Sequence, residues 1–214
     1  MDNRHFIARR AAQYFHKGEV VNLGIGIPSL CANYAEEGVL FQTENGLIGM
    51  GGIPQEENPS IYFYNAGGIP FVPVEGASAF DAAMSFGVIR SGRMAATVLG
   101  GLQVSADGDL ANWATPGRAF GMGGAMDLVN GAKKVIVAME LCDKQGRAKI
   151  VNACTLPYTG RKCVDHIVTE LCVIDVTEQG LVLREVRCGY TAKDIQAMVE
   201  PTLLIADDLK EMEE

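Results

Sequence analysis

Residues 41–52 read Phe-Gln-Thr-Glu-Asn-Gly-Leu-Ile-Gly-Met-Gly-Gly, which places one carboxylate, Glu44, just before a glycine-rich apolar run. Asn45-Gly46 is a strong turn signal, so we expect the backbone to reverse directly after Glu44 and to present its side chain at the rim of an element. The run over residues 47–52 has too many glycines to fill a core and too few charges for a solvated loop. Close approach of the backbone to a ligand accounts for both properties.

Apolar strands alternate with helical patterns around this stretch. Residues 20–28 predict a buried strand that runs into a glycine turn, with Pro28 at the first position of a helix through Cys31 to Glu36. Residues 135–139 are apolar on every side, which is typical of an inner parallel strand covered on both faces. We therefore expect an α/β fold, a mostly parallel sheet with helices on both faces.

Two further helices are predicted in the first half of the chain. Residues 1–17 have the apolar spacing of an ordinary first helix. After a long irregular connection over residues 53–76, a second helix is expected from Ala77 to Arg90. Its predicted buried stripe recurs every four residues, at Phe80, Met84 and Val88.

The C-terminal pattern differs from the rest. Residues 171–176 and 181–186 flank a turn sequence and predict a hairpin. Thr191, with an acidic residue three positions later, indicates the start of a last helix that ends near Pro201. The charged tail over residues 207–214 is expected to fray.

Composition restricts the class of protein. A chain of 214 residues that is 48% hydrophobic is sufficient for one large core, so we expect residues 1–214 to form a single domain. A net charge of -8 with 18 Lys and Arg argues against nucleic-acid binding, which needs clustered positive charge. No apolar run approaches the length of a membrane span, and six cysteines without paired spacing favour reduced thiols in the cytoplasm.

Two cofactor classes are not indicated by the sequence. Gly24 and Gly26 lack the third glycine and the acidic residue of a dinucleotide fingerprint, so we expect no nicotinamide cofactor. The turn that contains them still offers unpaired backbone N–H groups to an anion. Histidines and carboxylates do not cluster at metal-ligand spacing, so we expect no metal, and we expect the neighbouring Asp165 and His166 side chains to diverge.

The stretch around Glu44 resembles the Ser-Glu-Asn-Gly signature of the family I (3-oxoacid type) coenzyme A transferases, in the β subunit or C-terminal half that carries the catalytic glutamate. Thr43 stands in place of the usual serine. Further motifs resemble the family in its own order, at residues 24–28, 65–68, 108–113, 121–129 and 155–160. The likeness extends over nearly the whole chain and implies the three-layer fold of these enzymes.

The resemblance implies that Glu44 is a catalytic nucleophile in a ping-pong exchange. It would attack an acyl-CoA thioester to form an acyl-glutamyl anhydride, which the released thiolate converts to a glutamyl-CoA thioester. A second acid then reverses these steps and leaves as its CoA ester. A glutamate is ionised at neutral pH without a neighbouring base, so the removal of water from it is the remaining requirement.

Each addition passes through an oxyanion that needs backbone donors. Gly123 and Gly124 are the candidate donors, by resemblance and by their position before a predicted helix over residues 125–129. Taken singly, the glycines also fit close packing of a helix on a strand, and Glu44 fits a solvated turn. The resemblance further implies a set of substrate-binding residues: Gly24, Gly26, Asn45, Gly46, Asn65, Ala66, Gly67, Gly101 and Asn112.

The resembled family divides its activity between two related subunits or fuses them. A chain with the glutamate half alone implies a separate α subunit that supplies much of the CoA site, in an α2β2 heterotetramer. The implied substrates are coenzyme A esters and short-chain carboxylates of the acetoacetate, acetate, butyrate or succinate class. Gly101, where many relatives have alanine, and Glu140-Leu141, where a Glu-His or Arg-His pair is frequent, leave the acyl-chain preference open.

Three alternatives stay open. A dicarboxylate CoA-transferase acting on oxoadipate or glutaconate would share the motifs. A sugar-phosphate isomerase or deaminase would share the architecture and use carboxylates for proton transfer. A non-catalytic subunit would keep the fold for assembly, and its complex would keep full activity after Glu44→Gln.

Overall fold

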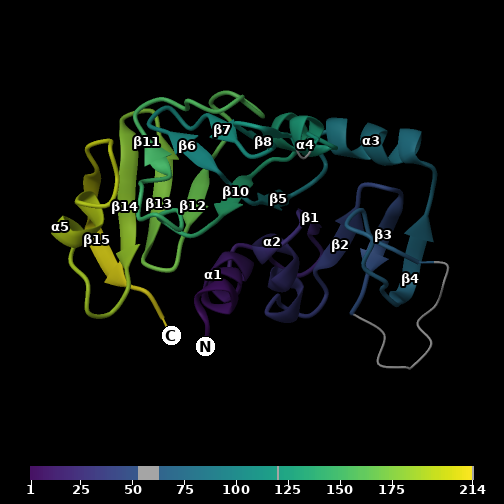
Figure 1. Cartoon of the computed structure of the whole chain (residues 1–214). Coiled ribbons are helices and arrows are strands. Elements are labelled where there is room, and N and C mark those ends of the chain that lie inside the picture. The colour runs from purple at the N-terminus through teal and green to yellow at the C-terminus, as the bar shows by residue number, and fades with distance from the viewer. Residues whose placement is uncertain (53–62, 120, 214) are drawn as a thin grey trace.

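The computed structural model of the chain describes residues 1–52, 63–119 and 121–213 (Figure 1). Its centre is a ten-stranded sheet with the strand order β15-β14-β13-β12-β10-β5-β1-β2-β3-β4. Five of the nine pairings between these described strands are parallel. The strands are β1 (Val20–Leu23), β2 (Leu40–Thr43), β3 (Leu47–Met50), β4 (Pro73–Ala79), β5 (Ala96–Leu99), β10 (Val135–Ala138), β12 (His166–Val168), β13 (Cys172–Thr177), β14 (Gly180–Val186) and β15 (Leu204–Glu211).

Helices cover both faces of this sheet, as predicted. Strand β10 is buried between them: Val135 and Val137 pack in one core with α4, whereas Ile136 and Ala138 pack in the other core with α1. One face carries α1 (Asn3–Ala12), α2 (Ile27–Leu30) and the 3₁₀ helix η1 (Cys31–Asn33), and the other carries α3 (Ala82–Arg90), α4 (Ala125–Gly131) and α5 (Ala192–Gln196). The apolar sequence of β10 is therefore explained by burial on both sides.

Two smaller sheets accompany the main one. One has the strand order β11-β6-β7, and the other pairs β8 with β9. In Figure 1, β6, β7 and β8 lie in the upper part of the view, as α4 does. Their strands are β6 (Gln103–Ser105), β7 (Leu110–Ala111), β8 (Ala114–Thr115), β9 (Arg118–Ala119) and β11 (Ile150–Val151).

The prediction of one helix from Ala77 to Arg90 is wrong in its first part. Its first three residues end β4, which pairs with β3, and α3 begins only after Asp81, whose carboxylate accepts a hydrogen bond from Met84 N at 2.8 Å. The predicted apolar stripe is not the buried one, since Met84 is 59% exposed whereas Ser85 is buried. The small Ser85 side chain lets α3 lie close to the sheet, where Gln42 Nε2 donates to Ser85 Oγ at 2.8 Å.

The prediction of a frayed tail over residues 207–214 is also wrong for its described part. Residues 204–211 form β15, which pairs in parallel with β14, and Met212 is buried in the core beside α1. The charges misled the prediction because β15 is an edge strand, where charged side chains are common. Of the expected irregular connection, residues 73–76 lie in β4 and residues 53–62 fall outside the described residues.

The C-terminal hairpin and the start of the last helix are confirmed. β13 and β14 pair antiparallel on either side of the predicted turn. Thr191 N donates to the Asp194 carboxylate at 2.8 Å, and Asp194 N donates back to Thr191 Oγ1, which makes a capping box at the start of α5. Two helical segments are shorter than predicted. Helix α5 ends at Gln196 and not near Pro201, and the helical segment after β1 ends at Asn33 and not at Glu36.

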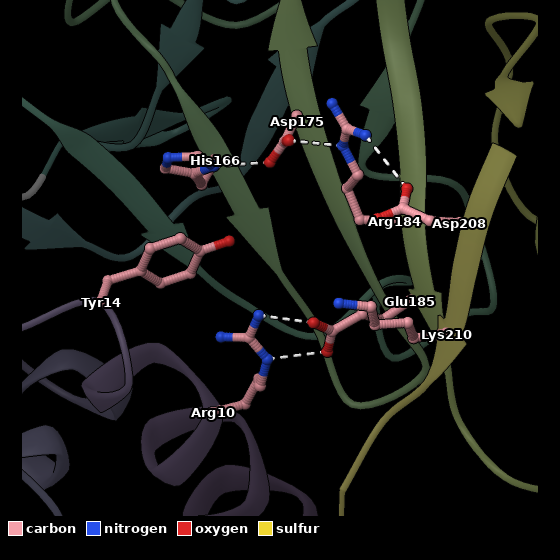
Figure 2. Close-up of a pocket in the computed structure, with 8 residues that line it drawn as sticks. All are labelled: Arg10, Tyr14, His166, Asp175, Arg184, Glu185, Asp208 and Lys210. Carbon is pink, nitrogen blue, oxygen red and sulfur yellow. Dashed lines mark hydrogen bonds and ion pairs between the residues drawn. The ribbon is translucent and has the colours of Figure 1, made fainter. Parts of the chain in front are cut away.

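A group of charged side chains ties the end of α1 to the C-terminal strands (Figure 2). Arg10 donates from Nε and from Nη2 to the two Glu185 carboxylate oxygens, each at 2.7 Å. His166 Nδ1 lies 2.6 Å from one Asp175 oxygen, and Arg184 Nε donates to the other at 2.7 Å. The Arg10–Glu185 pair joins residues 175 positions apart, and the whole group surrounds a hollow of about 180 Å³.

Asp175→Asn is expected to lower the free energy of unfolding at neutral pH by about 2 kcal/mol, the scale of hydrogen bonds to a charged group. Burial opposes ionisation of Asp175, but the hydrogen bonds from His166 and Arg184 outweigh it and hold the pKa of this carboxyl below its ordinary value of 3.8. Its contribution is therefore complete above that value and is lost as the pH falls through the lower folded pKa. Urea unfolding at neutral and progressively acidic pH measures this difference.

Asp208→Asn is the matched control for that experiment. The Asp208 side chain is 69% exposed and lies 3.6 Å from the same Arg184 guanidinium. Because exposed ion pairs contribute little, we expect a much smaller loss. Equal losses from the two substitutions would contradict the role assigned to Asp175.

Candidate active site

A cavity of about 730 Å³ lies at the carboxyl ends of β1, β5 and β2. Strand β1 lies between β2 and β5 in the sheet. The chain passes from β1 to β2 on one side of β1, and later from β5 to β10 on the other side. The connections after β1 and β5 therefore diverge, and open α/β sheets bind ligands at such a point. Leu23-Gly24 and Leu99-Gly100, at the ends of these two strands, line the cavity.

Glu44 stands at this end of the sheet because β2 turns directly into β3. The turn is the predicted one: Gly46 N donates to Thr43 O at 3.0 Å, and Gly46 has a φ of 123°, which favours glycine. Asn45 fixes the turn from outside the cavity. Its side chain accepts a hydrogen bond from Thr43 Oγ1 and donates to Tyr64 O at 2.8 Å.

The Glu44 carboxylate lies against the two glycines that precede α4. A Cβ added to Gly123 would be 3.7 Å from Glu44 Oε1, and a Cβ added to Gly124 would overlap the carboxylate, 2.9 Å from its Cδ. Within the described part of the chain, the N–H groups of both glycines donate no hydrogen bond to the protein. The carboxylate thus lies against the backbone of two glycines whose N–H groups have no hydrogen-bond acceptor among the described residues.

Glu44 lies in a cavity whose other described lining residues are uncharged, many of them large and apolar. Among the described lining residues Glu44 is the only charged one, and no hydrogen bond or ion pair joins it to another described residue. The carboxylate is therefore available to a ligand in the cavity. The large apolar lining residues are Leu23, Ile25, Met50, Ile69, Leu99, Leu102, Trp113, Met122 and Leu128.

The loop over residues 65–67 closes one side of the cavity. Asn65 Oδ1 accepts hydrogen bonds from Gly67 N at 2.9 Å and from Ile69 N at 3.0 Å. Ala66 N donates to Thr43 Oγ1 at 3.2 Å. The loop is thereby held against the residue that precedes Glu44.

The glycine turn after β1 forms another side. Gly24 N donates to Val98 O at 2.8 Å, and a Cβ added to Gly24 would come within 3.1 Å of that oxygen. Gly26 has a φ of 90° and precedes α2, where its carbonyl oxygen accepts a hydrogen bond from Ser29 Oγ at 2.8 Å. Gly24 therefore shapes the cavity, and Gly26 shapes the turn behind it.

Nine of the predicted site residues line the cavity and three do not. Gly26, Asn45 and Gly46 were expected to bind substrate but hold turns instead. At Gly46 an added Cβ would overlap Phe80 O, so glycine is required there for packing. The nine that line the cavity are Glu44, Gly123, Gly124, Gly24, Asn65, Ala66, Gly67, Gly101 and Asn112.

Sequence reasoning missed a buried polar chain beneath Glu44. Asn22 Nδ2 donates to Gln42 Oε1 at 2.7 Å, and Gln42 in turn donates to Ser85. All three are almost completely buried, and Asn22 and Gln42 line the cavity. A polar residue inside an apolar strand, as Asn22 is in β1, is the signal that could have found them, because buried polar groups need partners.

The far wall of the cavity is held by side-chain hydrogen bonds. Asn112 Nδ2 donates to Gly100 O at 3.1 Å, and Asn112 Oδ1 accepts from Thr159 Oγ1 at 2.6 Å. Trp113 Nε1 donates to Tyr158 O at 3.1 Å. The predicted role of Asn112 in shaping the pocket agrees with this position.

The histidines and cysteines lie outside the cavity lining. Asp165 accepts a hydrogen bond from the first N–H of β10 at 2.7 Å, whereas His166 contacts Asp175, so these neighbours diverge as predicted. None of the six cysteines, all within the described ranges, forms a disulfide bond, and burial raises the pKa of Cys31 and of Cys172 to about 12. Within the described residues, no group of His, Cys, Asp and Glu could hold a metal ion, and no helix is long and apolar enough to cross a membrane.

Residues 5–197 match the model of the family described as coenzyme A transferase. The chain is 47% identical to the β subunit of the acetate CoA-transferase of Haemophilus influenzae, with 100% of this chain and 96% of that protein covered. It is 44% identical to the B-type subunit of the succinyl-CoA:3-ketoacid coenzyme A transferase of Helicobacter pylori, with 92% and 96% covered. Its fold is similar to that of the acyl-CoA transferase YdiF from Escherichia coli O157:H7, with a TM-score of 0.80 at 22% identity, over 99% of this chain and 43% of that one. The chain therefore belongs to the coenzyme A transferase family, as a member of its β-subunit type.

Proposed function

We propose that this chain is the catalytic β subunit of an enzyme that moves CoA between short-chain acids through a glutamyl-CoA thioester on Glu44. The observation that carries the proposal is the Glu44 carboxylate against the backbone of Gly123 and Gly124, whose N–H groups donate no hydrogen bond to the described residues, in a cavity where Glu44 is the one charged residue of the described lining. An acyl-CoA thioester seated there would have its carbonyl carbon at the nucleophile and its oxygen at the donors.

The proposed reaction has two matched halves. A Glu44 oxygen attacks the thioester carbon, the C–S bond breaks, and CoA thiolate leaves an acyl-glutamyl anhydride. The thiolate then attacks the glutamyl carbonyl, so the first acid departs as a carboxylate and the CoA is held on Glu44. A second carboxylate attacks this thioester, and the same two steps in reverse release the new acyl-CoA and restore Glu44. The thioester bond is conserved, so no other energy source is needed.

The substrates that we propose are acids of the acetoacetate, acetate, butyrate or succinate class. The names of relatives with more than 40% identity include acetate and 3-ketoacid, which supports this range. An uncharged substrate tail is favoured, because no Arg, Lys or His is among the described lining residues to pair with a second carboxylate or a phosphate. For the same reason we rank succinate, oxoadipate, glutaconate and sugar phosphates behind short monocarboxylates.

A separate α subunit completes the proposed enzyme, in an α2β2 assembly. The relatives are named as β-type or B-type subunits, which supports a partner. Ile25 and Ile69 line the cavity and are exposed at its rim, as is typical of a surface that another protein covers. The partner would exclude water from Glu44 and add contacts to CoA. We propose the cytoplasm as the location, which agrees with the free thiols.

Glu44→Gln is expected to abolish the CoA adduct and to lower transferase activity of the assembled enzyme by more than about 10³-fold, as removal of a covalent nucleophile usually does. Mass spectrometry of the peptide holding Glu44, after incubation with an acyl-CoA, detects the adduct. Glu37→Gln, at an exposed position, is the matched control and should keep both adduct and activity. A fully active Glu44→Gln complex would instead identify a non-catalytic subunit.

Gly124→Ala is expected to lower activity by about 10²-fold, the scale of moving a reacting group by about 1 Å. The added Cβ would overlap the Glu44 carboxylate and lie 3.3 Å from Phe86 Cζ, so Glu44 has to move. Steady-state rates and the yield of the CoA adduct both report this displacement. Gly87→Ala is the control, since a Cβ on this exposed residue of α3 meets no heavy atom within 4 Å. A similar loss of activity in Gly87→Ala would contradict the role assigned to Gly124.

The purified chain alone is expected to have little or no transferase activity, and addition of its α subunit should restore it. The physical reason is that the cavity rim stays open to water until a partner covers it. Activity assays with and without the partner, beside mass determination of the complex, test the proposal. Full activity of the chain alone would refute the need for a second subunit.

A further inference from the structure

The far wall of the cavity contains a glycine with empty space in front of it. Gly100 follows β5 and lines the cavity, and a Cβ added there would meet no other heavy atom within 4 Å. Gly100 is not among the glycines with positive φ, so alanine fits its backbone. A side chain at this position would therefore extend into open space at the wall without strain.

The neighbouring Gly101 has the opposite environment. A Cβ there would lie 2.8 Å from Met139 Sδ and 2.8 Å from Val137 Cγ1, so it would enter the packed core behind the wall. Gly101 is the position at which the sequence left acyl-chain preference open. Because a side chain at Gly101 would collide with the core and one at Gly100 would not, we consider acyl-chain preference at Gly100.

The backbone of Gly100 cannot easily retreat from a ligand. Its carbonyl oxygen accepts a hydrogen bond from Asn112 Nδ2, and Asn112 is held in turn by Thr159 Oγ1. The wall is therefore defined by backbone and not by a flexible side chain.

The wall around Gly100 is also apolar. Leu99, Leu102 and Trp113 line the cavity beside it, and Glu44 is the single charged residue among the described lining. An apolar end wall suits the hydrocarbon end of a short acyl group.

We propose that Gly100 sets the longest acyl chain that this enzyme accepts. The inference rests on the proposed function, because it takes the acyl group on Glu44 to extend toward this wall. The absent side chain leaves room for the end of a butyryl group, and a methyl group at this position would fill that room while still admitting acetyl. One methylene in an apolar pocket changes discrimination by about 10- to 200-fold.

The test compares the assembled enzyme with its Gly100→Ala and Gly100→Val variants, using acetyl-CoA and butyryl-CoA as donors. In a ping-pong reaction, kcat/KM for the donor covers only the steps up to release of the first acid, so its ratio between donors isolates the acyl site. We expect Gly100→Ala to lower the butyryl-to-acetyl ratio by about 10-fold. Gly100→Val should lower the ratio further, and the matched control Gly87→Ala should leave it unchanged.

Two different failures are distinguishable in this experiment. An unchanged ratio in Gly100→Ala, or equal losses for both donors in both variants, would overturn the role of Gly100 while the unmodified enzyme still showed CoA transfer. No CoA adduct on Glu44 and no transfer from either donor in the unmodified enzyme would overturn the proposed function, and this inference with it.

Discussion

The Glu44 carboxylate can lie this close to the residue before α4 only because that residue, Gly124, has no Cβ. At Gly124 an added Cβ would overlap the Glu44 carboxylate, so the whole arrangement of the cavity depends on this one close approach. The position of Glu44 itself is also constrained. The turn after β2 places Glu44 at the carboxyl ends of the parallel strands, and this turn requires glycine at position 46 because a Cβ there would overlap Phe80 O. Strand β2 thus fixes the position of the carboxylate, and the absence of a side chain at Gly124 lets the segment before α4 approach it closely.

This constraint explains why the site was largely predictable from the sequence. Glycines beside a single glutamate indicate close backbone approach at short range, and the order of the motifs connects segments far apart in the chain. The missed residues have a different character. Asn22, Gln42 and Ser85 depend on a helix lying over two strands, and no local pattern reports which residues meet across such a distance.

The errors in the fold have related causes. Residues 77–79 precede a stretch with helical spacing and look like its first turn, yet they end β4 because pairing with β3 outweighs local preference. The charged C-terminal segment has the composition of a solvated tail. It nevertheless pairs with β14 as β15, and Met212 packs into the core beside α1. In both places, tertiary pairing decided between two local structures that the residues alone permit.

The cysteines have a consequence for the fidelity of such chemistry. An acyl-glutamyl anhydride reacts with any thiolate in reach, so a protein thiol could divert the acyl group into a dead-end S-acyl cysteine. None of the six cysteines lines the cavity. Burial also raises the pKa of Cys31 and Cys172 to about 12 and that of Cys154 and Cys163 to about 11, which keeps these sulfurs protonated at neutral pH. In the proposed mechanism, the activated intermediate would therefore meet no protein thiolate among the described residues that line the cavity.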